Sequence, residues 1–157
     1  MGVEIERKFL VAGDAWRGAS TGSRHLQQGY ICAGEGNTVR VRTDGARAWV
    51  TIKGEPQGIR RPEFEYGIPA EDADGLLALC GTRIVEKVRH LVPHGGRVFE
   101  VDEFLGANAG LIVAELELRR VDENVSLPSW IGREVSGDPR YANAALSLHP
   151  FGAWTRP

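Results

Sequence analysis

Short segments in which apolar and polar residues alternate recur along most of this chain. Because successive side chains of a β-strand point to opposite faces, such alternation predicts strands with one apolar and one polar face. The segments are rich in β-branched, aromatic and aliphatic residues, which favour strands. Strands are therefore expected near residues 3–11, 24–32, 37–43, 47–53, 61–68, 83–92, 97–104 and 111–120.

Turn and helix signals separate these segments. Glycine-containing turns at Gly34-Glu35-Gly36-Asn37, Thr43-Asp44-Gly45 and Pro93-His94-Gly95-Gly96 predict three hairpins. A stretch rich in Ala, Leu, Asp and Glu follows Pro69 and predicts a helix. The helices expected from composition and spacing cover residues 69–79, 13–19, 122–126 and 139–149.

The length of 157 residues suits one domain with a hydrophobic core of its own. About eight antiparallel strands with short connections favour a closed barrel, because closure removes exposed strand edges. We therefore expect a mainly β (α+β) fold, a closed eight-stranded antiparallel β-barrel with a few flanking helices. A single domain would span residues 1–157, and its tail, residues 150–157, would be flexible or cover one barrel end.

The polar faces of the predicted strands carry charges in an unusual order. Acidic residues are paired with acidic ones, and basic with basic, two positions apart. The pairs are Glu4 and Glu6, Arg40 and Arg42, Glu63 and Glu65, Lys87 and Arg89, Glu100 and Asp102, and Glu115 and Glu117, with Lys8 and Lys53 as further cations.

Like charges at this spacing lie roughly 7 Å apart on one strand and repel each other. An ordinary solvent-facing strand could explain one such pair, Glu100 and Asp102 for example, but it does not explain the whole series. Neighbouring strands of opposite sign could compensate the repulsion, and so could a bound polyanion with divalent cations. If the charged faces point inward, the barrel must enclose a hydrated tunnel, because buried like charges are too costly otherwise.

Composition narrows the possible partners. The net charge of -2 gives no general attraction to nucleic acid or to a membrane. We expect no signal peptide and no transmembrane segment. The two cysteines, Cys32 and Cys80, have no metal-binding spacing and are expected to be buried or half-buried free thiols, which indicates the cytoplasm.

The motif Glu4-Ile5-Glu6-Arg7-Lys8 matches the Glu-x-Glu-x-Lys signature of the CYTH superfamily, also called triphosphate tunnel metalloenzymes. The charged pairs listed above follow it in the family's order. Gln28-Gly29-Tyr30 and the segment 138–143 also resemble short bacterial members of the family, including inorganic triphosphatases.

This resemblance implies a tunnel that binds a triphosphate group together with Mg²⁺ or Mn²⁺. Oxygen ligands without a His or Cys set also favour these ions. The resemblance, and the expected adjacency of the first and eighth strands, assign the first ion to Glu4, Glu6 and Glu117. A second ion or the attacking water would use Glu63, Glu65, Asp102 and Glu115. The phosphate clamp would consist of Lys8, Arg40, Arg42, Lys53, Lys87 and Arg89.

The expected activity is hydrolysis of inorganic triphosphate to pyrophosphate and phosphate, by a monomer or homodimer whose partner is this small molecule. The alternatives are hydrolysis of an organic triphosphate (thiamine triphosphate or a nucleotide), class IV adenylyl cyclase activity, a polyphosphate-binding module, and a lipocalin-type barrel for apolar ligands. Some relatives carry a substrate-contacting Lys in the terminal helix. Here Ala142, Ala144 and Ala145 lie in that region, with Arg140 as a possible substitute. The sequence also lacks the His-Phe pattern associated with the cyclases.

Overall fold

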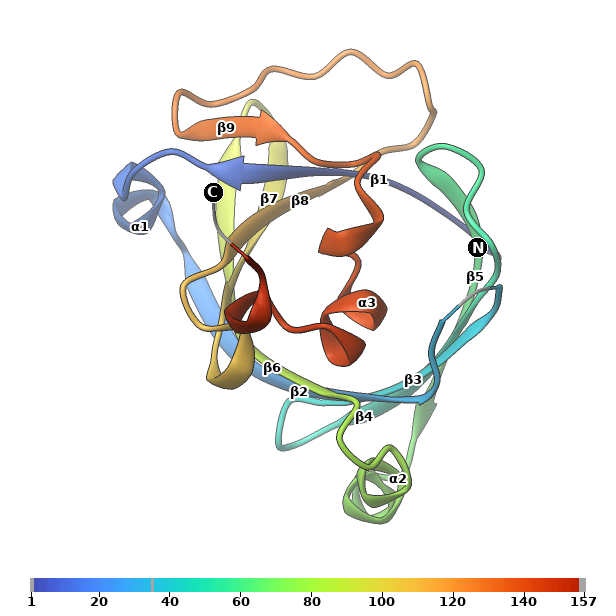
Figure 1. Cartoon of the computed structure of the whole chain (residues 1–157). Coiled ribbons are helices and arrows are strands. Elements are labelled where there is room, and N and C mark those ends of the chain that lie inside the picture. The colour runs from blue at the N-terminus through green and yellow to red at the C-terminus, as the bar shows by residue number, and fades with distance from the viewer. Residues whose placement is uncertain (1, 35, 156–157) are drawn as a thin grey trace.

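The computed structural model describes residues 2–34 and 36–155, and its main feature is a closed β-barrel. Its sheet has the strand order β5-β4-β3-β2-β6-β7-β8-β1-β9, and a further β5–β1 pairing closes the first eight strands into a ring (Figure 1). All neighbours pair antiparallel. The barrel strands are β1 (Gly2–Val11), β2 (Gly22–Cys32), β3 (Thr38–Thr43), β4 (Ala48–Lys53), β5 (Arg60–Ile68), β6 (Ile84–His94), β7 (Arg97–Phe104) and β8 (Ile112–Glu117). The predicted fold class is confirmed.

Glycines form the tight turn between β6 and β7. His94 pairs with Arg97, so only Gly95 and Gly96 lie in the loop, with φ angles of 59° and 76°. Positive φ at both positions is what a two-residue type I′ hairpin requires, and residues with a side chain rarely adopt it. The predicted β2–β3 turn includes Glu35, which lies outside the described residues.

The barrel closes at β1, which uses both of its edges. Residues Gly2–Ile5 pair with β5, and Glu6–Leu10 pair with β8 on the other edge. A ninth strand, β9 (Ile131–Glu134), pairs with β1 at Phe9 and Val11. The sequence analysis did not predict β9, because four residues without clear alternation give little local signal. It depends instead on long-range contacts such as the Arg7–Glu134 ion pair at 2.8 Å.

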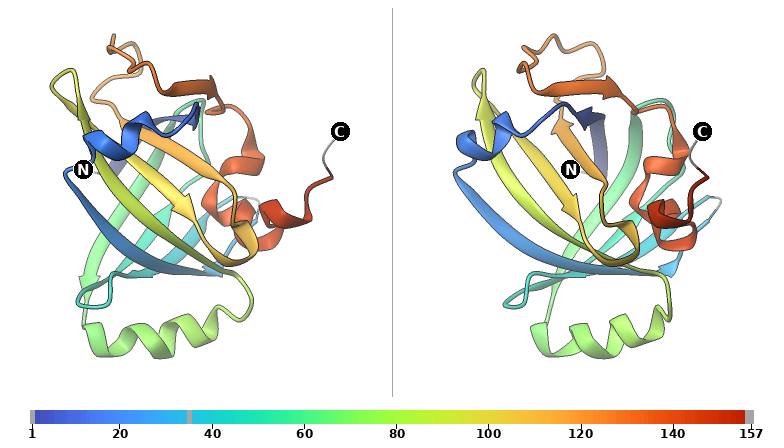
Figure 2. Two further views of the ribbon diagram at one scale, coloured as in Figure 1. Left: turned by 90° about the vertical axis from the view of Figure 1, so that its left-hand side faces the viewer. Right: turned by 60° about the vertical axis from the view of Figure 1, so that its left-hand side comes forward.

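The helices lie outside the barrel wall or at one end of it. The helix α1 (Ala15–Ala19) lies beside β6, and α2 (Ala73–Leu79) packs outside β2 and β3, preceded by the 3₁₀ turn η1 (Ala70–Asp72) (Figure 2). The helix α3 (Asn143–Leu148) lies over one barrel opening (Figure 1). Further 3₁₀ turns are η2 (Gly106–Asn108), η3 (Pro139–Tyr141) and η4 (Phe151–Ala153). Within the described residues, none of these helices is long and apolar enough to span a membrane.

The prediction of a helix over residues 122–126 is wrong. The segment begins in a turn and continues without regular secondary structure. Its side chains explain the outcome, because the Glu123 carboxylate binds Arg97 of β7 and Val125 packs on the core. Five residues are also too few to form a stable helix without tertiary support.

The helix predicted over residues 139–149 forms in two pieces. Ala142 adopts an extended conformation between η3 and α3, with a ψ of 137°. The break lets Tyr141 and Leu146 both enter the same apolar cluster. The following η4 turn packs against it through Trp154, which meets the Tyr141 ring edge-on. Residues 151–154 of the predicted tail therefore cover this end, and residues 156 and 157 lie outside the described part.

The hydrophobic core lies around the barrel and at its α3 end. One cluster packs on the outer faces of the strands, beneath α1, β9 and the segment leading to β9; its buried members are Phe9, Trp16, Val92, Phe99, Val101, Ala114, Leu116, Leu118 and Trp130. A second cluster fills the end under α3 and contains Tyr30, Val85, Phe104, Leu111, Val113, Val135, Tyr141 and Leu146. The middle of the barrel is thus left to polar residues.

Candidate active site in the barrel lumen

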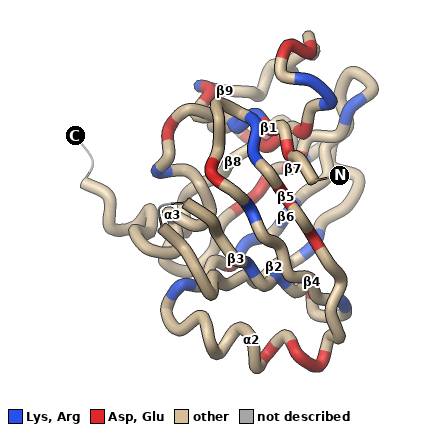
Figure 3. The backbone as a smooth tube through the Cα atoms, turned by 90° about the vertical axis from the view of Figure 1, so that its right-hand side faces the viewer, with Lys and Arg blue, Asp and Glu red and all other residues tan. Residues whose placement is uncertain are grey.

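The charged strand faces point into the barrel. Figure 3 shows acidic and basic positions interspersed along the barrel strands. Alternation explains the arrangement: Phe9 on β1 and Val101 on β7 pack outside, so their neighbours Lys8 and Glu100 face the lumen. This orientation argues against the lipocalin-type alternative, which required the charged faces to point outward.

A cavity of about 600 Å³ occupies the lumen. Predicted site residues make up much of its wall: Glu4, Glu6, Lys8, Arg40, Arg42, Lys53, Glu63, Glu65, Arg89, Glu115 and Glu117. Lys87 and Asp102 are the exceptions, since both are fully buried behind this wall. The fold therefore gathers residues from six strands into one space and leaves two of the predicted residues in a supporting position.

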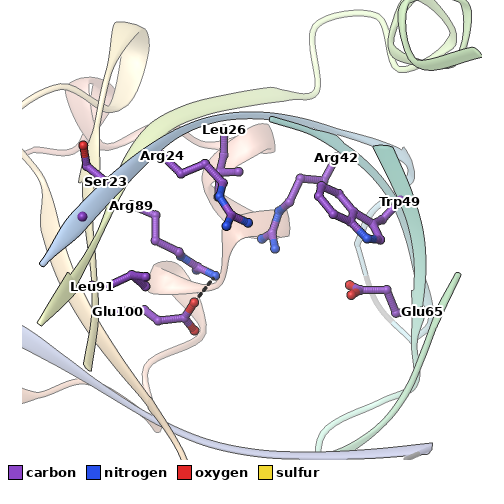
Figure 4. Close-up of a pocket in the computed structure, with 10 residues that line it drawn as sticks. Ser23, Arg24, Leu26, Arg42, Trp49, Glu65, Arg89, Leu91 and Glu100 are labelled. Atoms are coloured by element: carbon purple, nitrogen blue, oxygen red, sulfur yellow. Dashed lines mark hydrogen bonds and ion pairs between the residues drawn. The ribbon is translucent and has the colours of Figure 1, made fainter. Parts of the chain in front are cut away.

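A second cavity of about 570 Å³ lies toward the barrel end away from α3. It shares four wall residues with the first, so the two spaces adjoin; the shared residues are Arg42, Glu65, Arg89 and Glu100. Figure 4 shows Arg24, Arg42 and Arg89 directing their guanidinium groups into this space. Trp49, Leu26 and Leu91 add an apolar portion to its wall. The sequence analysis did not predict Trp49 or Arg24 as site residues.

Most lumen cations are bound to carboxylates. The Lys53 ammonium lies 3.0 Å from Glu4 and 3.2 Å from Glu63. Arg40 donates to Thr51 at 3.0 Å and to Glu65 at 3.2 Å, and its buried Nε has no hydrogen-bond partner among the described residues. An unpaired buried donor is costly unless a ligand or water satisfies it.

Asp102 holds two cations in place. It accepts from Lys87 at 2.7 Å, and Arg89 approaches both of its oxygens, at 2.8 and 2.9 Å. Arg89 also reaches Glu100 and Glu115, at 2.9 and 3.1 Å. Burial is the largest influence on Asp102, but Arg89 and Lys87 together hold its pKa below the ordinary value. For Lys87, burial lowers the pKa to about 7, with Asp102 opposing the change.

Arg42 lines the lumen and has no carboxylate partner in the described part of the chain, a feature that it shares with Arg61, whose Nε donates to the Gly54 carbonyl at 3.0 Å. Arg42 Nε donates to the Gln28 side chain at 2.9 Å. Burial, followed by repulsion from Arg40 and Arg89, lowers its pKa to about 10, so it stays charged at neutral pH. A charged guanidinium held among other cations is suited to bind an anion.

Carboxylates gather where β1, β5 and β8 meet. Glu6 pairs with Glu117 across β1 and β8. Burial, then Glu115 and Glu4, raise the pKa of Glu6 well above its ordinary value. Burial and neighbouring carboxylates also raise the pKa values of Glu63 and Glu117. The ionised forms of Glu6, Glu63 and Glu117 are therefore disfavoured even though Lys8 and Lys53 lie nearby, and a bound cation would stabilise them.

These carboxylates suit a hard divalent cation by their chemistry, because they supply oxygen donors only. In the described part of the chain, however, no three His, Cys, Asp or Glu side chains form a preformed metal-ligand group. Glu4 is bound to Lys53 instead. Metal binding at this cluster would therefore require Glu4 to release the Lys53 ammonium.

Gln28, Asn143 and Arg61 lie at the site but were not among the predicted site residues. Gln28 on β2 is fully buried and bonds Arg42, Tyr30 and Asn143. Asn143 begins α3 and accepts from Lys87 at 2.9 Å. By contrast Arg140, the suggested substitute for a terminal-helix lysine, is bound to Asp138 and is not part of the cavity wall. Two signals in the sequence pointed to Gln28 and Asn143: Gln28 and Tyr30 share one face of β2, and Gln28 and Asn143 lie in the two segments that resemble the family outside the charged pairs.

The chain resembles known proteins along nearly its full length. The CYTH domain model matches residues 2–142. An inorganic triphosphatase from Acetivibrio thermocellus is 45% identical over 152 residues, which cover 96% of this chain and 97% of the relative. An inorganic triphosphatase from Nitrosomonas europaea is 35% identical over 150 residues, covering 92% and 97%.

Solved structures agree with these matches. The crystal structure of an inorganic triphosphatase aligns with 34% identity and a TM-score of 0.66, covering 92% of this chain and 94% of that one. A protein from Pyrococcus horikoshii shares the fold at 19% identity, with a TM-score of 0.57 and coverage of 75% and 80%. From the match to the family model and the identity to both relatives, we conclude that this chain belongs to the CYTH domain family.

Proposed function

We propose that this protein is a metal-dependent hydrolase that cleaves inorganic triphosphate into pyrophosphate and phosphate inside the barrel. The observation that carries the proposal is the closed lumen, in which six cations from five strands (Lys8, Arg40, Arg42, Lys53, Arg61 and Arg89) line a space next to a cluster of carboxylates. The similarity to two inorganic triphosphatases over nearly the whole chain supports the same substrate.

The cations would bind and orient the phosphate chain. Phosphoryl transfer depends mainly on positioning and charge neutralisation, so a fixed set of cations is the main requirement. Arg42 and Arg40 are suited to direct contact, since one has no carboxylate partner among the described residues and the other has an unpaired Nε. Lys8, Lys53 and Arg89 would exchange part of their contacts with carboxylates for contacts with phosphate. Lys87 acts from behind the wall.

We propose that Glu4, Glu6 and Glu117 hold a divalent ion, Mg²⁺ or Mn²⁺. The raised pKa values of Glu6 and Glu117 support this, because a cation would relieve the repulsion that raises them. Such an ion neutralises charge on the phosphoryl oxygens and lowers the pKa of bound water. Oxygen-only ligation favours these ions over zinc.

The remaining carboxylates differ in their suitability for handling the attacking water. Glu63 has a pKa raised by burial and by Glu4 and lines the cavity, so it is a candidate to accept a proton. Lysine and arginine neighbours hold the pKa of Glu115 well below its ordinary value, which suits water orientation or metal ligation. Glu65 is fixed by Thr51 and Arg40. Asp102 does not line the cavity and is proposed to position Lys87 and Arg89.

Other parts of the proposal concern the whole chain. We propose one domain over residues 1–157, acting in the cytoplasm as a monomer or homodimer on a small-molecule substrate, without nucleic acid or membrane. The free thiols support a reducing compartment, with Cys80 buried and Cys32, contrary to expectation, exposed.

Phosphate release from tripolyphosphate, ATP and thiamine triphosphate, each with Mg²⁺, Mn²⁺ or EDTA, tests the activity. We expect metal-dependent release that is fastest with tripolyphosphate. Glu6→Gln should lower it by about 100-fold or more, because even partners one step removed from a metal cost roughly 10- to 100-fold. Metal-free tripolyphosphate binding should persist in this variant.

The matched control is Glu86→Gln on β6, which removes a carboxylate that binds His25 on the outside of the barrel. It should leave turnover unchanged. Faster release from ATP or thiamine triphosphate would change the substrate, and tripolyphosphate binding without any release would favour the polyphosphate-binding module.

A further inference from the structure

Asn143 separates a buried cation from the lumen. It is the first residue of α3 and forms part of the cavity wall. Lys87 lies behind it, fully buried, with its ammonium bound to Asp102 and to the Asn143 side chain. Lys87 therefore does not line the lumen itself, but it is hydrogen-bonded to a residue that does.

The hydrogen bonds of Asn143 determine the orientation of its side-chain amide, with the oxygen directed toward Lys87 and Gln28. Lys87 Nζ and Gln28 Nε2 both donate to Asn143 Oδ1, at 2.9 and 3.3 Å. An ammonium can only donate, so the atom that it contacts must be the oxygen. The orientation of Gln28 is fixed in turn, because Arg42 Nε donates to its Oε1 at 2.9 Å. Asn143 Oδ1 thus accepts from Lys87 directly and is linked to Arg42 through the Gln28 amide.

The other end of the amide is available. In residues 2–34 and 36–155, no protein acceptor is hydrogen-bonded to Asn143 Nδ2, and this donor is not among the fully buried unsatisfied atoms. An amide whose oxygen accepts from a cation is polarised, and its N–H groups become stronger donors. Asn143 thus offers an oriented, polarised donor beside a space surrounded by cations.

We propose that Asn143 is a further substrate-binding residue, whose Nδ2 donates a hydrogen bond to a phosphoryl oxygen. Lys87 strengthens this bond by polarising the Asn143 amide. This rests on the proposed function, since it assumes that the lumen holds the phosphate chain. Gln28 is then a positioning residue, because it fixes the Asn143 amide without contacting the substrate.

The alternative role for Asn143 is purely structural: a latch that ties α3 to the barrel wall. The substitution Asn143→Asp separates the two roles. Aspartate keeps the shape and pairs with Lys87 more strongly, so a latch would be retained or strengthened. The same change removes the donor and places a carboxylate next to the phosphate chain, so substrate binding would weaken.

The test is calorimetric titration of tripolyphosphate in EDTA, where no turnover interferes, into the wild type, Asn143→Asp, Asn143→Ala and the control Ser147→Ala. Ser147 lies on the same helix, and its hydroxyl donates to the Ala144 carbonyl within that helix. Loss of a hydrogen bond to a charged group should weaken binding about 10-fold or more for both Asn143 variants. The control should match the wild type, and Asn143→Asp should keep the wild-type Tm.

A second readout follows the amide itself. The side-chain ¹H–¹⁵N signal of Asn143, assigned by its disappearance in Asn143→Asp, should shift when tripolyphosphate binds. Unchanged affinity in both variants, or an unshifted signal, would overturn the role of Asn143 while leaving the proposed function in place. Failure of the wild type to bind tripolyphosphate would overturn the proposed function, and this inference with it.

Discussion

Glu6 and Glu115 both line the lumen, yet their pKa values are shifted in opposite directions. Glu115 has Lys8 and Arg89 beside it, at 3.8 and 3.1 Å, and these cations hold its pKa well below the ordinary value. Glu6 also has Lys8 nearby, at 3.9 Å, but burial and then Glu115 and Glu4 raise its pKa. Because burial disfavours ionisation at both positions, the neighbouring charges account for the opposite directions of the two pKa shifts.

Glu6 should make the metal-free protein less stable as the pH rises. Between its ordinary value of 4.5 and its raised pKa, folded Glu6 keeps a proton that the unfolded chain has released. Stability contributed by the protonated form is lost as the pH rises through this window. Glu6→Gln, which stays neutral, should thus gain stability relative to the wild type between pH 4.5 and pH 8.

Urea unfolding in EDTA across this pH range gives the comparison. Mg²⁺ should then stabilise the wild type at pH 8 and have little effect on Glu6→Gln. A stability difference between the two proteins that does not change with pH would show that the charge on Glu6 is compensated in the folded state.

At the scale of elements, α2 is positioned by close packing between Gly29 of β2 and Cys80 at the end of the helix. A Cβ added at Gly29 on β2 would lie 2.7 Å from Cys80 Sγ and 2.8 Å from Ile84 Cδ1. Cys80 follows α2 directly and is fully buried. The absence of a side chain at residue 29 therefore allows the end of α2 to contact the strand.

Gly29→Ala should lower the free energy of unfolding by about 1–3 kcal/mol, the usual range for an overpacked site. Gly67→Ala on β5 is the matched control, because its added Cβ would meet nothing within 4 Å. Urea unfolding of the two variants measures both effects. Equal stabilities would mean that α2 shifts away from β2 without cost.

At the scale of the whole molecule, the barrel has its polar residues inside and its apolar cores outside and at one end. The lumen charges come from strands far apart in the sequence: Arg89 on β6 binds Glu115 on β8, and Lys53 on β4 binds Glu4 on β1. A ligand that spans these strands would stabilise the closed barrel as a unit, since the unfolded chain has no such site.

Tripolyphosphate in EDTA should therefore raise the free energy of unfolding, by about 2.7 kcal/mol at a concentration of 100 times its Kd. Monophosphate at the same concentration should stabilise less, because it spans fewer cations. High salt should weaken the effect by screening. Equal stabilisation by both anions in thermal or urea unfolding would contradict a site extended along the lumen.

Local alternation was sufficient to predict the eight barrel strands, because the period of two is encoded in each segment separately. It also placed Glu4 and Glu6, or Arg40 and Arg42, on one face of their strands. The residues further indicated that this face points inward, since so many like charges needed compensation. The structure confirms the barrel and brings these residues together, and their individual roles remain predictions.

Other features depended on contacts between residues distant in the sequence. β9 pairs with β1, where Glu134 is bound to Arg7, and Asn143 of α3 accepts a hydrogen bond from Lys87, 56 residues away in the sequence. The sequence by itself thus determined which residues share a strand face, because that is a local property of the backbone. Only the tertiary structure decided that Asp102 and Lys87 lie behind the wall and that Gln28 and Asn143 join the site, because burial and hydrogen bonding there are set by elements packed from elsewhere in the chain.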